Sequence, residues 1–179
     1  MKKNFLKILM TLSAASLLYS CKNADPKNNL VLIDISGSNL STIDKTLDKV
    51  YEVYSESMPS DTFEVYFFSS VKYLAFSGQK LNKDRDFLPI LKAGLEKAKK
   101  IKVNEGTSFS ICKNVLENSK DYDHAFLFTD GFFENSKLET IKLNEKSNIR
   151  IVGLSIENNE RILNSLSDPK KATIDFQGN

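Results

Sequence analysis

Continuous apolar runs alternate along the chain with segments in which apolar residues recur every three or four positions. The continuous runs contain many β-branched residues, which predicts strands buried on both faces. The second spacing places apolar residues along one side of a helix. We therefore expect strands at residues 30–35, 62–69, 71–77, 124–129, 149–155 and 172–176. We expect helices at residues 41–57, 87–101, 108–118, 136–145 and 159–167.

The order of these elements predicts an α/β fold. Strands that alternate with helices form a doubly wound, mostly parallel central sheet with helices on both faces. The strands at 62–69 and 71–77 are too close for a crossover helix, so they should form a hairpin that adds one antiparallel edge strand. Ligands of such sheets bind beyond the carboxyl ends of the strands, where the strand order reverses. Asp34 and Asp130 each lie at the end of a predicted strand, so they meet there if their strands are neighbours.

The composition supports one globular domain and gives no electrostatic reason for nucleic-acid binding. The 179 residues are 41% hydrophobic and 27% charged, values typical of a folded domain. The net charge of +2 comes from 25 basic and 23 acidic residues, and three of the lysines lie within the first twenty positions. Without that segment the chain carries a charge of −1, so no basic surface for nucleic acid is expected.

The N-terminus matches an export signal. A basic start is followed by an apolar stretch, and residues 18–21 (LYSC) resemble the lipobox of bacterial lipoproteins, in which the cysteine is lipidated. The lipid on Cys21 would hold the protein on a membrane of the bacterial cell envelope. The alternative is a plain secretory signal with an incidental cysteine. We expect a lipoprotein signal peptide at 1–20, a lipid-anchored tether at 21–29 and the folded domain at 30–179.

Cysteine and histidine, the residues that most often bind zinc or act as nucleophile and base, are scarce in this chain. Cys112 lies in a predicted helix, where we expect it to be a buried, small apolar side chain. His124 is the only histidine, so zinc sites and Cys–His sites are not expected. Phe132 and Phe133 follow Asp130, and the sequence leaves open whether they form an apolar rim at the site or pack inward.

Oxygen-bearing side chains gather in three short segments at predicted strand ends and helix starts. These segments, DISGS at 34–38, GT at 106–107 and TDG at 129–131, each contain a glycine, which permits close backbone approach. Their two carboxylates and three hydroxyls form an all-oxygen donor set, which suits Mg²⁺, Mn²⁺ or Ca²⁺ rather than zinc or copper. The alternative is that Ser38 and Thr107 only cap the helices that follow them. The candidate metal ligands are Asp34, Ser36, Ser38, Thr107 and Asp130.

The DxSxS segment at 34–38 matches the metal-ion-dependent adhesion site, and the chain over roughly 30–176 is similar to von Willebrand factor A-type and integrin I-type domains. Thr107 matches the loop threonine of that family, with Ser108 as the alternative, and Asp130 matches its later aspartate. The resemblance implies that the serines bind the metal directly, the threonine directly or through water, and the aspartates largely through water. It also implies that an acidic side chain of a protein partner completes the octahedron.

The expected function is a non-enzymatic, metal-dependent protein-binding module, displayed on a bacterial membrane, whose cation bridges to an acidic residue of the partner. One alternative is a metal-dependent phosphohydrolase that uses Asp34 as nucleophile or metal ligand. Ser36 and Ser38 stand where such chemistry usually needs a further carboxylate, which disfavours this alternative. Another alternative is a structural subunit whose metal only stabilises the fold. No nucleic-acid partner is expected.

Overall fold

The computed structural model describes residues 25–101, 106–119, 121–133, 138–153 and 156–176. The predicted signal peptide and Cys21 lie outside these ranges. Within the ranges, no helix is long and apolar enough to cross a lipid bilayer. The strands are β1 (Asn28–Asp34), β2 (Thr62–Phe68), β3 (Lys72–Gln79), β4 (His124–Phe128), β5 (Asn148–Gly153) and β6 (Ala172–Phe176). The helices are α2 (Gly37–Leu40), α3 (Ile43–Glu56), α4 (Phe87–Ile101), α5 (Phe109–Asn118) and α6 (Ile156–Ser165).

The strands of the described chain form one sheet in the order β3-β2-β1-β4-β5-β6. β1 is parallel to both of its neighbours, β5 and β6 continue the parallel arrangement, and β3 at one edge is antiparallel to β2. This topology confirms the predicted α/β fold with one antiparallel edge strand. The chain passes from β1 to β2 on one side and later reaches β4 on the other, so the strand order reverses beside β1. Asp34 ends β1 at this reversal.

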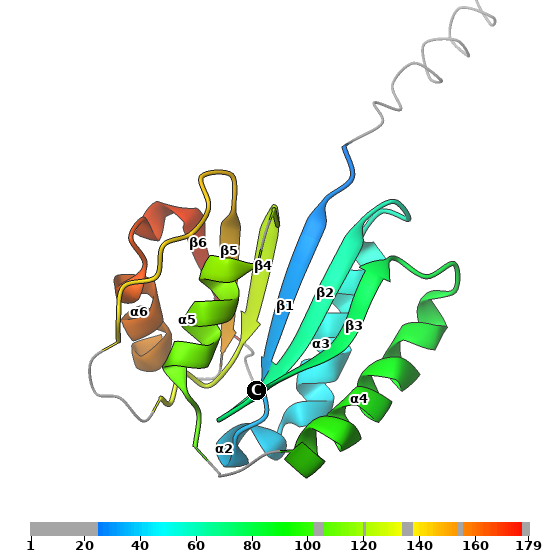
Figure 1. Ribbon diagram of the computed structural model, residues 1–179, viewed down its shortest axis with the longest axis horizontal. Helices are drawn as coiled ribbons and strands as arrows, with labels where there is room; N and C mark the ends of the chain where they lie inside the picture. Colours follow the sequence, from blue (N-terminus) through cyan, green and yellow to red (C-terminus); the bar gives the residue numbers. More distant parts are fainter. Residues whose placement is uncertain (1–24, 102–105, 120, 134–137, 154–155, 177–179) are drawn as a thin grey trace, which may run out of the picture.

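Helices cover both faces of the sheet (Figure 1). α3 and α4 pack on one face, in a core that includes Val31 and Ile33 of β1. α5 and α6 pack on the other face, in a core that includes Leu30 and Leu32. Successive side chains of a strand point to opposite faces, and both faces are buried here. This double burial explains why β1 is a continuous apolar run rather than an alternating one.

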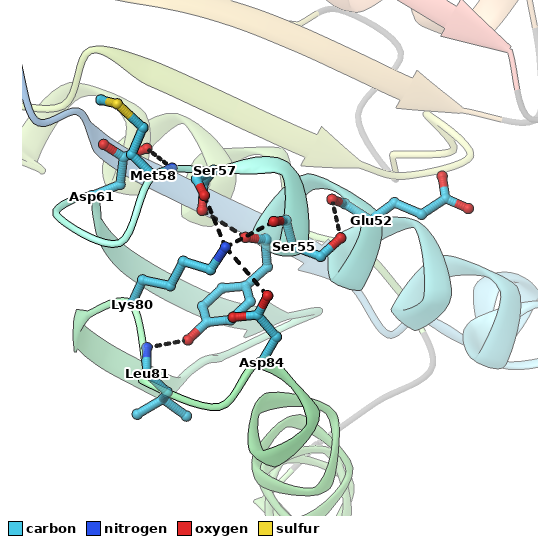
Figure 2. A network of polar contacts seen from close by, with 9 residues as sticks. Glu52, Ser55, Ser57, Met58, Asp61, Lys80, Leu81 and Asp84 are labelled. Carbon is cyan, nitrogen blue, oxygen red and sulfur yellow. Dashed lines mark hydrogen bonds and ion pairs between the residues drawn. The ribbon is translucent and has the colours of Figure 1, made fainter. Parts of the chain in front are cut away.

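Lys80, which directly follows β3, binds main-chain carbonyls at the carboxyl end of α3 (Figure 2). Lys80 Nζ donates to the main-chain carbonyls of Ser55 and Ser57, each at 2.8 Å, and pairs with Asp84 Oδ2 at 3.4 Å. The ammonium also lies over the Tyr54 ring, 5.5 Å from its centroid. A cation is favourable at this end of a helix, because the last carbonyls carry partial negative charge. α3 has no basic residue in its own last turn, so a distant part of the chain supplies the cation.

The helix predicted at 136–145 is wrong for residues 138–145, which are not helical; the rest of it lies outside the described residues. Instead, Ile141 is fully buried and forms an isolated bridge with the end of α6. Its N–H donates to the Ser165 carbonyl at 2.8 Å, and its carbonyl accepts the Ser167 N–H at 2.9 Å. These long-range bonds stabilise an extended segment, and a helix of about ten residues has too little intrinsic stability to compete with them.

The other elements lie close to their predicted positions. β1 begins at Asn28, two residues before the predicted strand, and α6 begins at Ile156, three residues before the predicted helix. α5 carries Cys112, which is fully buried as expected for a small apolar side chain. Burial raises the pKa of the Cys112 thiol far above its usual value, which keeps the sulfur protonated.

Candidate metal centre

Asp34 lies at the centre of the candidate site. Its side chain is 1% exposed at the carboxyl end of β1. Oδ1 accepts the Ser36 N–H at 2.8 Å and the Thr107 hydroxyl at 3.3 Å. Oδ2 accepts the Thr129 hydroxyl at 2.8 Å. Groups from three separate loops therefore converge on one carboxylate, and they can do so because β1 and β4 are direct neighbours in the sheet.

The two serines of the DxSxS segment lie side by side. Ser36 Oγ and Ser38 Oγ are 3.2 Å apart, with Ser36 buried and Ser38 exposed. The short helix α2 begins directly after Ser36, and Asn39 Nδ2 donates to Ser36 Oγ at 3.2 Å. Thr42, not Ser38, is the N-cap residue of α3. The structure therefore gives no support to helix capping as the role of Ser38 and places its hydroxyl at the exposed side of the site.

Thr107 faces the site, whereas Ser108 does not. The buried Thr107 hydroxyl contacts both oxygens of Asp34, at 3.3 and 3.4 Å. Ser108 Oγ is 2.8 Å from Ser110 Oγ, and the Ser108 N–H donates to the Ser69 carbonyl at 3.0 Å. The N-cap residue of α5 is Ser108, so Thr107 does not cap that helix. Of the two alternatives left by the sequence, the threonine is the one beside the carboxylate.

Asp130 starts a tight turn after β4. Its Oδ1 accepts the Phe132 N–H at 2.9 Å, and its main-chain carbonyl accepts Asn158 Nδ2 at 3.2 Å. Gly131 has a φ of +72°, and a Cβ atom at this position would lie 2.7 Å from Asn158 Cβ, so the turn requires glycine. Burial is the main reason that the pKa of Asp34 is raised, and the negative charge of Asp130 adds a smaller contribution in the same direction.

Thr129 belongs to the site, although sequence reasoning did not name it as a candidate ligand. Its hydroxyl makes the shortest side-chain contact to Asp34 and also accepts the Gly131 N–H at 3.0 Å. The segment 129–131 stands out in the sequence because of its aspartate and glycine. A hydroxyl directly before a strand-end aspartate is the one signal that pointed to Thr129, and it gains meaning only once β4 is known to lie beside β1.

The electrostatics of this cluster fit a hard divalent cation. Burial raises the pKa of Asp34 to about 6, the charge of Asp130 adds to this, and hydrogen bonds from Ser36 and Thr129 oppose it. A divalent cation would offset the repulsion between the carboxylates. Nowhere in the described ranges do three His, Cys, Asp or Glu side chains form a metal-binding group. The side chains that meet around Asp34 carry carboxylate and hydroxyl oxygens, the donor type that Mg²⁺, Mn²⁺ and Ca²⁺ prefer.

Phe132 and Phe133 differ in their environment, and only Phe133 packs inward. Phe133 is buried and packs edge-on against Phe109 of α5, with ring centroids 5.0 Å apart. Phe132 is 70% exposed. The turn after Asp130 therefore buries one ring in the core and presents the other to solvent.

Several solved structures resemble this chain. The von Willebrand factor type A protein from Catenulispora acidiphila matches 87% of this chain and 39% of its own, with a TM-score of 0.55 and 13% identity. The ArnB paralog VWA2 from Sulfolobus acidocaldarius matches 86% of this chain and 41% of its own, with a TM-score of 0.60 and 16% identity. Proximal thread matrix protein 1 from the mussel byssus was solved with a zinc-occupied MIDAS motif. It matches 84% of this chain and 44% of its own, with a TM-score of 0.56 and 17% identity.

The match spans only 39% to 44% of the length of these structures. No protein-family model matches the sequence, and no curated protein matches it. Identities of 13% to 17% show a shared fold and nothing finer. The sheet order, the antiparallel edge strand and these structural matches agree, and the chain has the α/β fold of von Willebrand factor A-type domains.

Proposed function

We propose that this chain is a non-enzymatic, metal-dependent protein-binding module. The observation that carries the proposal is the convergence of Ser36, Thr107 and Thr129 on the buried Asp34 carboxylate, at the edge of the sheet where the strand order reverses. Asp34 accepts hydrogen bonds from all three loops, and the hydroxyl oxygens of Ser36 and Ser38, which follow it in the chain, lie 3.2 Å from each other. A bound Mg²⁺, Mn²⁺ or Ca²⁺ would supply Lewis acidity toward an anionic ligand. The zinc-occupied MIDAS motif of the mussel protein supports a divalent ion here.

The partner that we propose presents an acidic side chain to this site. Asp34 and Asp130 would together offset the charge of a bound divalent cation, and the hydroxyl donors would add no further negative charge. The site therefore stays attractive to one more carboxylate. Mg²⁺ usually divides its coordination positions among a few protein oxygens, water and a ligand. Ser38, the exposed member of the set, marks the side from which the carboxylate of the partner would approach.

The surroundings of Asp34 favour binding over phosphohydrolysis. Both of its oxygens accept hydrogen bonds, one from a main-chain N–H and the other from the Thr129 hydroxyl. A nucleophilic carboxylate instead needs an oxygen directed at the substrate. Release of phosphate from p-nitrophenyl phosphate in the presence of Mg²⁺, lost in Asp34→Asn, would contradict the non-enzymatic proposal.

Capture of the partner from native membranes should depend on divalent metal, and EDTA should release it. Once the partner is identified, Thr107→Ala should weaken its binding by at least about tenfold, or about 1.4 kcal/mol, because the hydroxyl beside Asp34 is lost. Ser108→Ala is the matched control and should bind normally, since Ser108 Oγ pairs with Ser110. Replacing one acidic residue of the partner should reproduce the loss. Affinity that is insensitive to EDTA, or to every single acidic replacement, would rule out this mechanism.

We further propose that a lipid on Cys21 holds the module on a membrane of the bacterial cell envelope. The lipobox-like residues 18–21 support this anchor. Cys21→Ser should move the protein from the membrane fraction to the soluble fraction, because a diacylglycerol chain is the proposed attachment. Mass spectrometry of the mature N-terminal peptide measures the modification directly, and a peptide that contains Cys21 without lipid would contradict the anchor.

A further inference from the structure

One aromatic side chain beside the candidate metal centre is exposed to an unusual degree. Phe132 is 70% exposed, more than any other large apolar side chain among the described residues. Exposed apolar residues scattered over a surface are ordinary, so position is what distinguishes Phe132. It follows Asp130 by two residues, a stretch of chain that spans at most about 7 Å. The backbone of Phe132 therefore lies close to Asp130, with its N–H on the Asp130 carboxylate, and its exposed ring belongs to the surface next to the proposed site.

The backbone on both sides of Phe132 is held in place. Its own N–H donates to Asp130 Oδ1 at 2.9 Å, and the preceding Gly131 N–H donates to the Thr129 hydroxyl at 3.0 Å. The following residue, Phe133, is anchored in the core against Phe109. A ring presented from a fixed backbone loses little conformational entropy when it binds, which is the property of an aromatic interface anchor. The exposed ring itself contributes little to folding, because most of its surface stays in water.

We infer that Phe132 is a specificity-determining contact, which selects a partner whose carboxylate stands next to an aromatic or other apolar group. This inference rests on the proposed function, because the carboxylate must first be held at the cation. A group beside that carboxylate then lies over the surface where Phe132 is exposed. Ring-to-ring contact adds to affinity only for ligands that carry such a group. A partner with a bare Asp or Glu on a polar surface is therefore disfavoured relative to one with an apolar neighbour.

Two small carboxylates test this inference, because they differ only in an aromatic ring. Acetate and phenylacetate are titrated by NMR into the full-length protein at saturating Mg²⁺. Phenylacetate should bind about fivefold more tightly than acetate to the wild type. Phe132→Ser should abolish this preference while leaving acetate affinity and the melting temperature unchanged. Ile90→Ser is the matched control, because Ile90 is an exposed apolar residue near the start of α4, and it should keep the preference.

The outcomes separate the inference from the function on which it rests. A preference that disappears in Phe132→Ser and persists in Ile90→Ser supports the contact. Equal affinities of acetate and phenylacetate for the wild type, or a preference that survives Phe132→Ser, overturn it and leave the metal-dependent binding intact. If neither carboxylate binds with Mg²⁺, or both bind equally well in EDTA, the proposed function fails and the inference fails with it.

Discussion

In the Asp34→Asn protein, Mg²⁺ and Mn²⁺ should no longer raise the melting temperature. A ligand that binds only the native wild-type protein stabilises it by about 2.7 kcal/mol at 100 times its Kd. For a domain of this size this corresponds to an increase of about 5 to 10 °C. Asp34→Asn keeps the size of the side chain but removes the charge on which Ser36, Thr107 and Thr129 converge. Calorimetry with metal and with EDTA measures both responses.

The control for this experiment is another aspartate that lies far more open to solvent. Asp44 is exposed in the first turn of α3, and Asp44→Asn should keep the full metal response. An equal increase in melting temperature in the wild type and in Asp34→Asn would show that the stabilising cation binds elsewhere on the chain. Loss of the response in both variants would show that general surface charge, rather than this site, attracts the metal.

Without metal, the Asp34→Asn protein should instead be more stable than the wild type. The pKa of Asp34 rises from 3.8 in the unfolded chain to about 6 in the native protein, so the native state binds more protons between these two values. The free energy of unfolding of the wild type should therefore fall as the pH rises from about 4 to about 7, by up to about 3 kcal/mol. Asp34→Asn lacks this titration, so in EDTA at pH 7 it should be more stable than the wild type. Denaturant unfolding across this pH range measures the difference.

Lys80→Met should lower the free energy of unfolding by about 2 to 3 kcal/mol. The Lys80 side chain is only 6% exposed, and its ammonium donates to the Ser55 and Ser57 carbonyls at the end of α3. Methionine preserves most of the apolar stem that packs near Tyr54 but leaves both carbonyls and Asp84 without their cation (Figure 2). Partly buried carbonyls left without a partner are costly, whereas the lost ion pair alone would matter less.

Lys49→Met on the same helix is the matched control for this substitution. Lys49 pairs with Glu52 at 2.7 Å, but the two side chains are 51% and 56% exposed. An ion pair that is open to solvent contributes little, so the change should stay within about 0.5 kcal/mol. Urea denaturation of both variants measures the two losses. If the free energy of unfolding falls equally in Lys80→Met and Lys49→Met, the hydrogen bonds of Lys80 to the end of α3 do not stabilise the fold.

Local patterns in the sequence predict most of this fold and most of the candidate site. Strands buried on both faces need apolar residues at every position, and helices need them at every third or fourth, so each type of element leaves its own spacing. The same patterns predict where strands end. Asp34 and Asp130 lie at such ends, which makes them candidates for a shared site before any strand order is known. The predictions of strands, helices and strand ends hold because each depends on a few consecutive residues.

The tertiary structure decided the features that depend on distant parts of the chain. The placement of β4 beside β1 brings Thr129 to Asp34, and the loop before α5 turns Thr107 rather than Ser108 toward the same carboxylate. Residues 138–145 are not helical, because Ile141 forms its main-chain hydrogen bonds with Ser165 and Ser167 at and after the end of α6. Hydrogen bonds and packing between residues far apart in sequence leave no periodic signal, and their energies exceed the weak local preferences that they override.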